Sequence, residues 1–236
     1  MIGASAGGVS ALISLLGELP ADYRLPVVVL LHLPDDRHSE LALAKAALTQ
    51  VKPATAAWPF KPAEAKKLLL IMPDHMKVQA LAAALQHYSN KRFVIDSISL
   101  QQTDVSQAAA QIAAADLVIS GFIAPMQSLA DIGGMDDLTG IANIAAAYER
   151  QSLQFETLLP QIKAKKKPHV FLSLRAPYDI SRYGQYADVV LASYAYNTSE
   201  QPTAMGAGNA VYEALAQALL GQYRLTGKLP VTVSGY

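Results

Sequence analysis

Short, uninterrupted apolar runs alternate along the chain with longer segments in which apolar residues recur every three to four positions. The runs are rich in Val, Ile and Leu, which is typical of strands buried on both faces of a parallel sheet. They occupy residues 27–30, 68–71, 93–95, 117–119, 170–172 and 189–191. Helical periodicity occupies residues 9–16, 44–51, 78–85 and 211–219. This alternation predicts a three-layer α/β/α sandwich with a mostly parallel sheet.

Two long connectors interrupt the alternation. Residues 52–67 carry three prolines and are predicted to be mostly irregular, and residues 121–140 carry a Gly-Gly and an Asp-Asp pair. Loops of this length at strand ends commonly carry function in α/β proteins, or they cover a sheet edge. No internal repeat accompanies the pattern. We therefore expect residues 1–236 to form a single flavodoxin-like or Rossmann-like domain.

Composition narrows the possible classes of protein. The chain has 236 residues, 52% of them hydrophobic, and its 19 basic side chains balance 19 acidic ones. This argues against a disordered protein and against nucleic-acid binding through a bulk basic field. The absence of cysteine excludes disulfides and thiolate sites. The apolar runs are too short to cross a membrane, and no signal peptide is visible, so we expect a cytoplasmic protein if it is expressed as given.

A serine motif opens the chain. Residues 3–7 read GASAG, which fits G-x-S-x-G, a pattern that places a serine in a sharp turn beside backbone amides. His32 closes the next predicted strand, and the ends of successive parallel strands meet at one sheet edge. Ser5 and His32 could thus act as nucleophile and base. Alternatively, Ser5 only caps a helix and His32 is a hydrogen-bonded loop residue.

The first 37 residues resemble the start of chemotaxis protein-glutamate methylesterase domains. The resemblance rests on residues 2–8 (IGASAGG), 19–23 (LPADY), 26–29 (PVVV) and 31–34 (LHLP). It implies that Ser5 corresponds to the family's nucleophile and His32 to its base. The family's aspartate has no convincing counterpart, and a Ser–His pair without an orienting acid loses much of its rate enhancement.

From residue 38 onward the chain resembles the carboxy-terminal domain of bacterial family 3 glycoside hydrolases, in particular two-domain β-N-acetylglucosaminidases. The resemblance rests on residues 39–47, 58–62, 67–71, 171–179 (FLSLRAPYD), 210–215 and 227–233. It implies that the catalytic residues belong to a preceding barrel, for which this chain has no room. Arg175, Asp179 and Asp136 could contact sugar, but we favour a local Arg175–Asp179 strut.

Other polar features have simpler interpretations. The lysines at positions 163 and 165–167 are predicted to be a solvated helix end. Residues 206–209 are interpreted as a helix start, since they lack a Walker lysine and the dinucleotide spacing. His75, His87 and His169 show no metal-ligand spacing. We expect no metal and no cofactor, and we identify no partner, whether nucleic acid or membrane. The oligomeric state is open.

The two resemblances together suggest a chimera of residues 1–37 and 38–236. Only Met1 and Ile2 are left to form a strand before the serine motif, and the sites of both families are incomplete. These features favour an engineered fusion with no complete active site and no native catalytic activity. Two alternatives remain, an amino-sugar-binding accessory domain and a weak serine hydrolase that uses Ser5 and His32.

Overall fold

The computed structural model describes residues 2–5, 29–32, 37–52, 67–101, 106–124, 138–198 and 209–235. The strands are β1 (Ile2–Ser5), β2 (Val29–His32), β3 (Thr49–Lys52), β4 (Lys67–Met72), β5 (Val94–Ser99), β6 (Leu117–Phe122), β7 (His169–Ser173) and β8 (Val189–Ala192). The helices are α2 (Arg37–Ala47), α3 (His75–Tyr88), α4 (Ala108–Ala114), α5 (Leu138–Ala164), α6 (Ile180–Tyr183) and α7 (Ala210–Leu219). Short 3-10 turns, η3 (Pro177–Asp179) and η4 (Gly184–Tyr186), flank α6.

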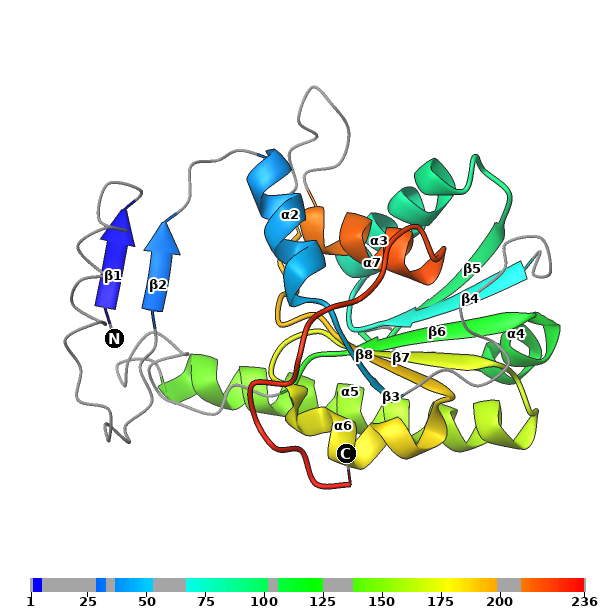
Figure 1. The fold of residues 1–236 in the computed structure, drawn as a ribbon. Coiled ribbons are helices and arrows are strands. Elements are labelled where there is room, and N and C mark those ends of the chain that lie inside the picture. The colour runs from blue at the N-terminus through cyan, green and yellow to red at the C-terminus, as the bar shows by residue number, and fades with distance from the viewer. Residues whose placement is uncertain are drawn as a thin grey trace.

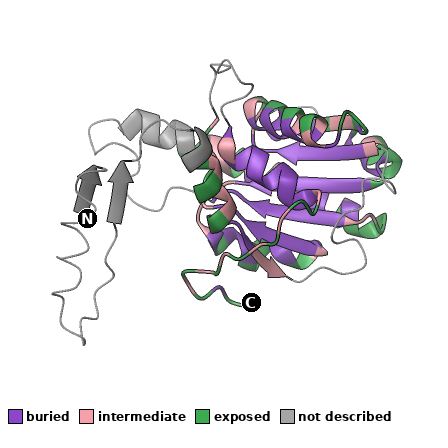
Figure 2. Cartoon of the chain, turned by 45° about the horizontal axis from the view of Figure 1, so that its top comes forward, coloured by how far each residue is buried: buried purple, intermediate pink, exposed green. Residues whose placement is uncertain are grey.

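Six strands form one sheet in the order β3-β8-β7-β6-β4-β5 (Figure 1). All neighbours in it are parallel except β3, which runs antiparallel to β8. The central strands are almost wholly buried (Figure 2), and this explains their continuous apolar runs. The mostly parallel sheet predicted from the sequence is confirmed.

Alternate residues of each strand point into two separate cores, as the pleat of a strand requires. Leu68 and Leu70 of β4 join the core formed with α3, α7 and part of α2. Leu69 and Ile71 of the same strand join the core formed with α4, α5 and α6. The helices therefore cover both faces of the sheet, which confirms the three-layer α/β/α architecture. Within the described part of the chain, no helix is both long and apolar enough to cross a membrane.

Strands β1 and β2 form a two-stranded parallel sheet of their own. The described strands therefore form two sheets, whereas the sequence predicts one. The first strand runs from Ile2 to Ser5 and so ends at the serine of the G-x-S-x-G motif. The predicted helix over residues 9–16 lies outside the described residues, and the assignment of residues 1–236 to a single domain stays a prediction.

Some element boundaries differ from the predicted ones. The periodicity over residues 44–51 predicted one helix, but α2 ends at Ala47 and Thr49–Lys52 form β3. Hydrogen bonding to β8 decides the conformation of this short polar segment. The connector expected over 121–140 is shorter, because β6 continues to Phe122 and α5 begins at Leu138. Helix α5 was not singled out, and it contains Pro160.

Candidate functional site at the carboxyl edge of the sheet

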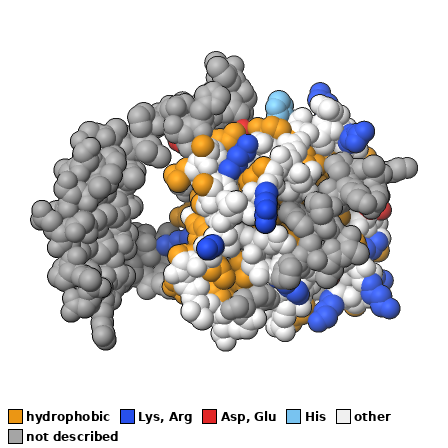
Figure 3. All heavy atoms as spheres, in the orientation of Figure 1, with side chains coloured by type: hydrophobic (Ala, Val, Ile, Leu, Met, Phe, Trp, Pro, Cys, Tyr) orange, Lys and Arg blue, Asp and Glu red, His pale blue; other side chains and the backbone are white. Residues whose placement is uncertain are grey.

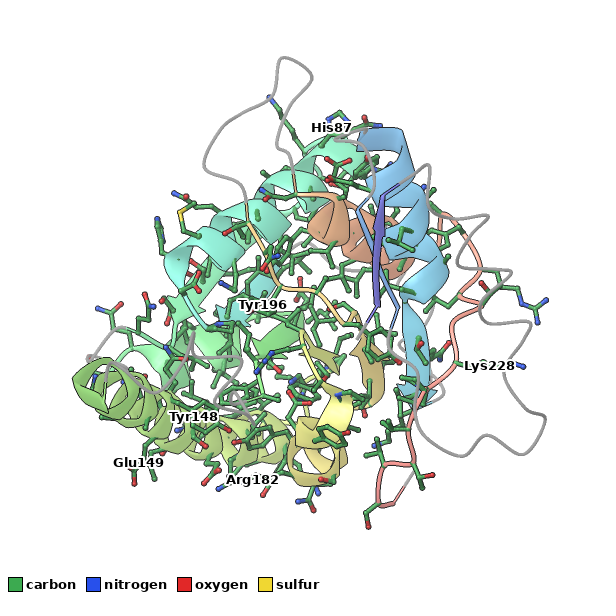
Figure 4. All side chains as sticks on the ribbon, turned by 90° about the vertical axis from the view of Figure 1, so that its left-hand side faces the viewer. His87, Tyr148, Glu149, Arg182, Tyr196 and Lys228 are labelled. Carbon is green, nitrogen blue, oxygen red and sulfur yellow. The ribbon has the colours of Figure 1, made fainter. Side chains whose placement is uncertain are left out.

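The order of the strands defines where a site is expected. The chain passes from β4 to β5 on one side and then returns to β6, β7 and β8 on the other. Ligands of open α/β sheets bind at the carboxyl ends of the strands, near such a reversal. Here this edge is formed by the segments that follow β4, β6, β7 and β8, and Figure 4 views the molecule from that side.

One polar cluster at this edge is fully engaged in holding the fold. Asp74 caps α3, since its Oδ1 accepts a hydrogen bond from the backbone N of Lys77 at 3.0 Å, and its Oδ2 pairs with Lys77 Nζ. Lys77 Nζ also lies 5.8 Å from the ring centre of Tyr196. Tyr212 donates from its hydroxyl to the Tyr196 carbonyl at 2.9 Å. These contacts join the ends of β4 and β8 to α3 and α7.

Asp179 is the least satisfied polar group of the edge. Ser173, the last residue of β7, donates from Oγ to Asp179 Oδ1 at 2.5 Å. Asp179 Oδ2 is buried and has no hydrogen-bond partner within the described part of the chain. Burial raises the pKa of Asp179 to about 7, against the hydrogen bond from Ser173, which lowers it. The structure therefore holds a carboxyl group that changes charge near neutral pH.

The residues around Asp179 differ from the predicted strut. Asp179 is buried, as a strut requires, but its side-chain partner is Ser173 rather than Arg175. Arg175 is half-buried in the same connection, and Tyr178 is 46% exposed beside it. Asp136 lies outside the described residues. Whether these side chains contact a ligand stays a prediction.

A second network fastens the segment that carries Asp179 to α5. Tyr183 of α6 is bonded through its hydroxyl to Ser152 Oγ at 2.8 Å and donates to Glu156 Oε1 at 3.2 Å. Arg182 pairs with the same Glu156 oxygen at 2.5 Å. Figure 4 shows Tyr148 of α5 and Arg182 of α6 on the same side of this edge. The pKa of Tyr148 is raised, chiefly by burial, with opposing effects from the charges of Arg182 and Asp179.

The sequence-predicted pair Ser5 and His32 lies at the ends of β1 and β2. The parallel register aligns the two residues as direct Cα partners. The strands thus place both at one edge of the small sheet, as predicted from the order of strand and helix. Their catalytic role stays a prediction.

A buried histidine was not recognised as notable from the sequence. His169 Nε2 lies 2.7 Å from Ser120 Oγ, and its Nδ1 lies 3.0 Å from the Tyr186 carbonyl. Burial lowers the pKa of His169 to about 4, so the ring is neutral at neutral pH. In this state Nδ1 donates to the carbonyl and Nε2 accepts from the serine. Since Ser120 and His169 are 0% and 1% exposed, no substrate reaches them, and the pair is structural.

The described residues hold no group of three or more His, Cys, Asp or Glu side chains that could bind a metal ion. His75 and His87 are exposed on α3, far along the helix from each other. The lysines after α5 are placed as predicted, because α5 ends at Ala164 and Lys163, Lys165 and Lys166 are exposed.

Comparison with known proteins finds similarity to two families, as the sequence analysis predicts. Residues 1–123 match the CheB methylesterase family. A β-hexosaminidase A from Pseudoalteromonas piscicida is 40% identical over 201 residues, which are 85% of this chain and 33% of that protein. A protein-glutamate methylesterase/protein-glutamine glutaminase from Burkholderia orbicola is 35% identical over 77 residues, 33% of this chain and 23% of that protein. The chain thus spans a third or less of these relatives.

Solved structures share the fold at low sequence identity. A fungal multi-domain GH3 β-N-acetylglucosaminidase superposes with a TM-score of 0.56 at 18% identity, covering 83% of this chain and 19% of that one. A β-glucosidase from Listeria innocua superposes with a TM-score of 0.53 at 15% identity, covering 80% and 26%.

The methylesterase match extends to residue 123, well past the expected junction at 37, and so overlaps the region that resembles the hexosaminidase. Both sources contribute parallel α/β sequence, which makes such an overlap physically natural. By its match over residues 1–123 the chain belongs to the CheB methylesterase family, and it combines this with similarity to glycoside hydrolase family 3 over most of its length.

Proposed function

We propose that the chain contacts carbohydrate through the carboxyl edge of its six-stranded sheet and carries no complete hydrolytic site of its own. The observation that carries this proposal is the 40% identity to a β-hexosaminidase over 85% of the chain, which corresponds to only a third of that enzyme. The ligand class that follows is an amino sugar such as N-acetylglucosamine.

The side chains of the edge suit such a ligand. Tyr178 is exposed and offers an aromatic face for the apolar side of a sugar ring, with a hydroxyl that can also bond. Arg175 is half-buried three residues earlier and can donate to sugar oxygens. Asp179 is buried next to Tyr178 and tied to Ser173, so it positions this connection instead of meeting the ligand directly.

The expectation of no hydrolysis rests on the carboxyl groups that glycoside cleavage needs. A glycosidase uses two carboxyl groups, or an equivalent pair, on either side of the scissile bond. Three described carboxyl groups lie at this edge: Asp74 is paired with Lys77, Glu156 is paired with Arg182, and Asp179 is buried. We therefore expect the purified chain to leave p-nitrophenyl N-acetyl-β-D-glucosaminide uncleaved. Turnover above the background of a mock purification would overturn this part of the proposal.

Binding can be measured by calorimetry or by NMR titration with N-acetylglucosamine and its β-1,4-linked dimer. We expect weak, saturable binding that Tyr178→Ala reduces by about fivefold, since loss of an aromatic contact is worth about 1 kcal/mol. Leu153→Ala is the matched control, because Leu153 is also an exposed large apolar side chain but lies on the outer face of α5. If neither sugar binds the wild-type chain, the proposal is wrong.

We include the engineered joining of two parent sequences in this proposal. The presence of two similarities in one chain supports it, because both fall on sequence that alternates strands and helices, and such sequence can be joined between helices and strands. A natural coding sequence that carries both portions in one reading frame would overturn the engineered origin and leave the binding proposal untouched.

A second candidate function is favoured by the register of β1 and β2. Because Ser5 and His32 are aligned at the strand ends, they could act as nucleophile and base of a weak methylesterase-like hydrolase. A fluorophosphonate probe should then label the chain, and both Ser5→Ala and His32→Gln should abolish labelling. Ser181→Ala is the control, since Ser181 is an exposed serine on α6. An unlabelled wild-type chain would exclude this candidate.

A further inference from the structure

A group of positive side chains lies at the opposite edge of the sheet, where the parallel strands begin. We call it the basic edge and define it as Lys67, Lys91, Arg92, Lys165, Lys166 and Lys167. Lys67 begins β4, Lys91 and Arg92 precede β5, and the other three precede β7. Figure 3 shows lysine and arginine side chains along the right-hand side of the described body, where these strands start. Segments far apart in the sequence thus bring their charges to one edge.

Helix dipoles account for only part of this grouping. Cations are favourable near the carboxyl end of a helix, and this explains a basic residue in or just after the last turn of α3 or α5. The effect falls off within that turn, yet three lysines follow the end of α5 at Ala164. Lys67 begins a strand, so no helix end accounts for it. The common feature of the six residues is therefore the edge, not a helix.

The described carboxylates offset only part of the positive charge of this edge, because six basic side chains lie there beside Asp116 and Asp188. None of the six side chains takes part in an ion pair with a described carboxylate. Asp116 and Asp188, which precede β6 and β8, accept hydrogen bonds from the backbone N of Lys67 and of His169. Asp96 of β5 bonds the backbone N of Ser97 and the side chain of Gln111. The nearby carboxylates thus hold the backbone while the lysines stay solvated.

Two neighbouring lysines make contacts that stabilise the fold. Lys52 Nζ donates to the Ala187 carbonyl, and Lys163 Nζ lies 5.6 Å from the ring centre of Tyr186. Lys91, Arg92, Lys165 and Lys166 are exposed, as is Lys163, but no such contact to a described residue accompanies these four. The exposed charges span from β7 to β5, three strand spacings or about 14 Å.

We propose that the basic edge binds an anionic polysaccharide. A row of separate cations of this length matches repeated anionic groups on an extended chain, and it matches no single small anion. Single-stranded nucleic acid is less suited, because its binding sites combine positive charge with aromatic faces for the bases. Of the described aromatic residues beside these strand starts, Phe93 is buried, Tyr88 is half-buried and donates to Glu213, and Tyr186 lies under Lys163. The basic edge lies at the opposite end of the strands from the carboxyl edge. A negative result for polysaccharide binding therefore leaves the proposed sugar contact at the carboxyl edge untouched, and the reverse also holds.

The test is retention of the full chain on immobilised heparin over a salt gradient. The variant Arg92→Gln/Lys165→Gln/Lys167→Gln removes three charges and avoids Lys91 and Lys166, whose backbones are left-handed with φ of 57° and 51°. The control Arg150→Gln/Arg224→Gln/Lys228→Gln removes three exposed charges elsewhere. Circular dichroism establishes that both variants are folded.

We expect the wild type and the control to elute at the same salt concentration. The basic-edge variant should elute at much lower salt, with an affinity at low ionic strength reduced by about tenfold or more. Equal loss in the control, or no retention of the wild type at low salt, overturns the proposal. Competition in solution decides the class of ligand. Poly(dT) and chondroitin sulfate are compared, at equal concentrations of negative charge, as competitors that release the protein from heparin. If poly(dT) releases it at the lower concentration, the ligand is nucleic acid and the polysaccharide proposal is wrong.

Discussion

At the scale of single residues, Gly227 has the most demanding position among the described glycines. A Cβ atom added there would lie 2.5 Å from the carbonyl oxygens of Ala47 and Leu48. Both are backbone atoms of the link between α2 and β3, so neither can move without shifting that link. We predict that Gly227→Ala destabilises the chain by about 2–3 kcal/mol, within the range for overpacked sites. Urea denaturation followed by circular dichroism measures this difference.

Gly121 provides the comparison for Gly227. A Cβ atom there would lie 2.8 Å from Met72 Sδ, in a flexible side chain that can move aside. Gly121→Ala should therefore destabilise the chain less than Gly227→Ala, although Gly121 is in a central strand. Equal effects of the two substitutions would contradict the argument from the Ala47 and Leu48 carbonyls.

The hydrogen-bond partners of individual polar side chains at the site could not be predicted from the sequence. The sequence analysis favours a local strut between Arg175 and Asp179, since Arg–Asp pairs commonly have this role. In the structure, η3 turns Asp179 back onto Ser173 at the end of β7. Which side chain Asp179 bonds depends on the backbone path through the three residues of η3, and the pattern of charges along the sequence does not predict that path. The location at a strand end, by contrast, followed from the apolar run of β7.

At the scale of elements, β5 is the last described strand of the six-stranded sheet, and a side chain on it disfavours pairing of its outer edge with another strand. Asp96 Oδ1 accepts a hydrogen bond from the backbone N of Ser97 at 2.9 Å, and Val94 is 63% exposed nearby. A charged side chain that occupies a main-chain amide makes an edge strand a poor template for another strand. We predict that Asp96→Ala increases self-association relative to the wild type. Light scattering across a concentration series measures it.

Asp96→Asn separates the two contributions of this carboxylate. Asparagine keeps an oxygen that can accept from Ser97 but loses the charge. If the covered amide matters, Asp96→Asn should stay close to the wild type while Asp96→Ala associates. Glu149→Ala removes an exposed carboxylate from α5 and serves as the control for net charge. Unchanged scattering by Asp96→Ala would refute the proposed role.

Elements were predictable where burial on both faces left a continuous apolar run. The strands from Leu68, Leu117, Val170 and Val189 were found in this way, because a parallel strand under two helical layers has no polar face. The antiparallel edge strand β3 was missed, since Thr49, Gln50 and Lys52 give no such run. Its strand conformation comes from pairing with β8 and from contact with the carboxy-terminal segment at Gly227.

At the scale of the whole molecule, two buried groups link stability to pH in opposite directions. Burial lowers the pKa of His169 to about 4, below its unfolded value of 6.5. The stability that the neutral ring contributes is therefore present above pH 6.5 and is lost as the pH falls toward 4. Burial raises the pKa of Asp179 from 3.8 to about 7. The stability that its protonated form contributes is present below pH 3.8 and is lost as the pH rises through 7.

These two dependences overlap between pH 4 and 6.5, where each amounts to about 3 kcal/mol at 1.36 kcal/mol per pH unit. As the pH falls through this window, the fold loses stability at His169 and gains a similar amount at Asp179. We predict that these contributions nearly cancel in the wild-type chain, so that its urea midpoint changes little across the window. Neither group alone would give this behaviour, which makes it a property of the pair.

Two non-titrating variants expose the separate dependences. In Asp179→Asn only His169 remains, so stability should fall by about 3 kcal/mol from pH 6.5 to 4. This variant should also exceed the wild type in stability at pH 8, because the fold no longer has to hold the ionised Asp179 side chain in its interior. In His169→Asn only Asp179 remains, so stability should rise as the pH falls. His87→Asn replaces an exposed histidine and should follow the wild type. Parallel curves for all four proteins would mean that neither buried group titrates as its surroundings require.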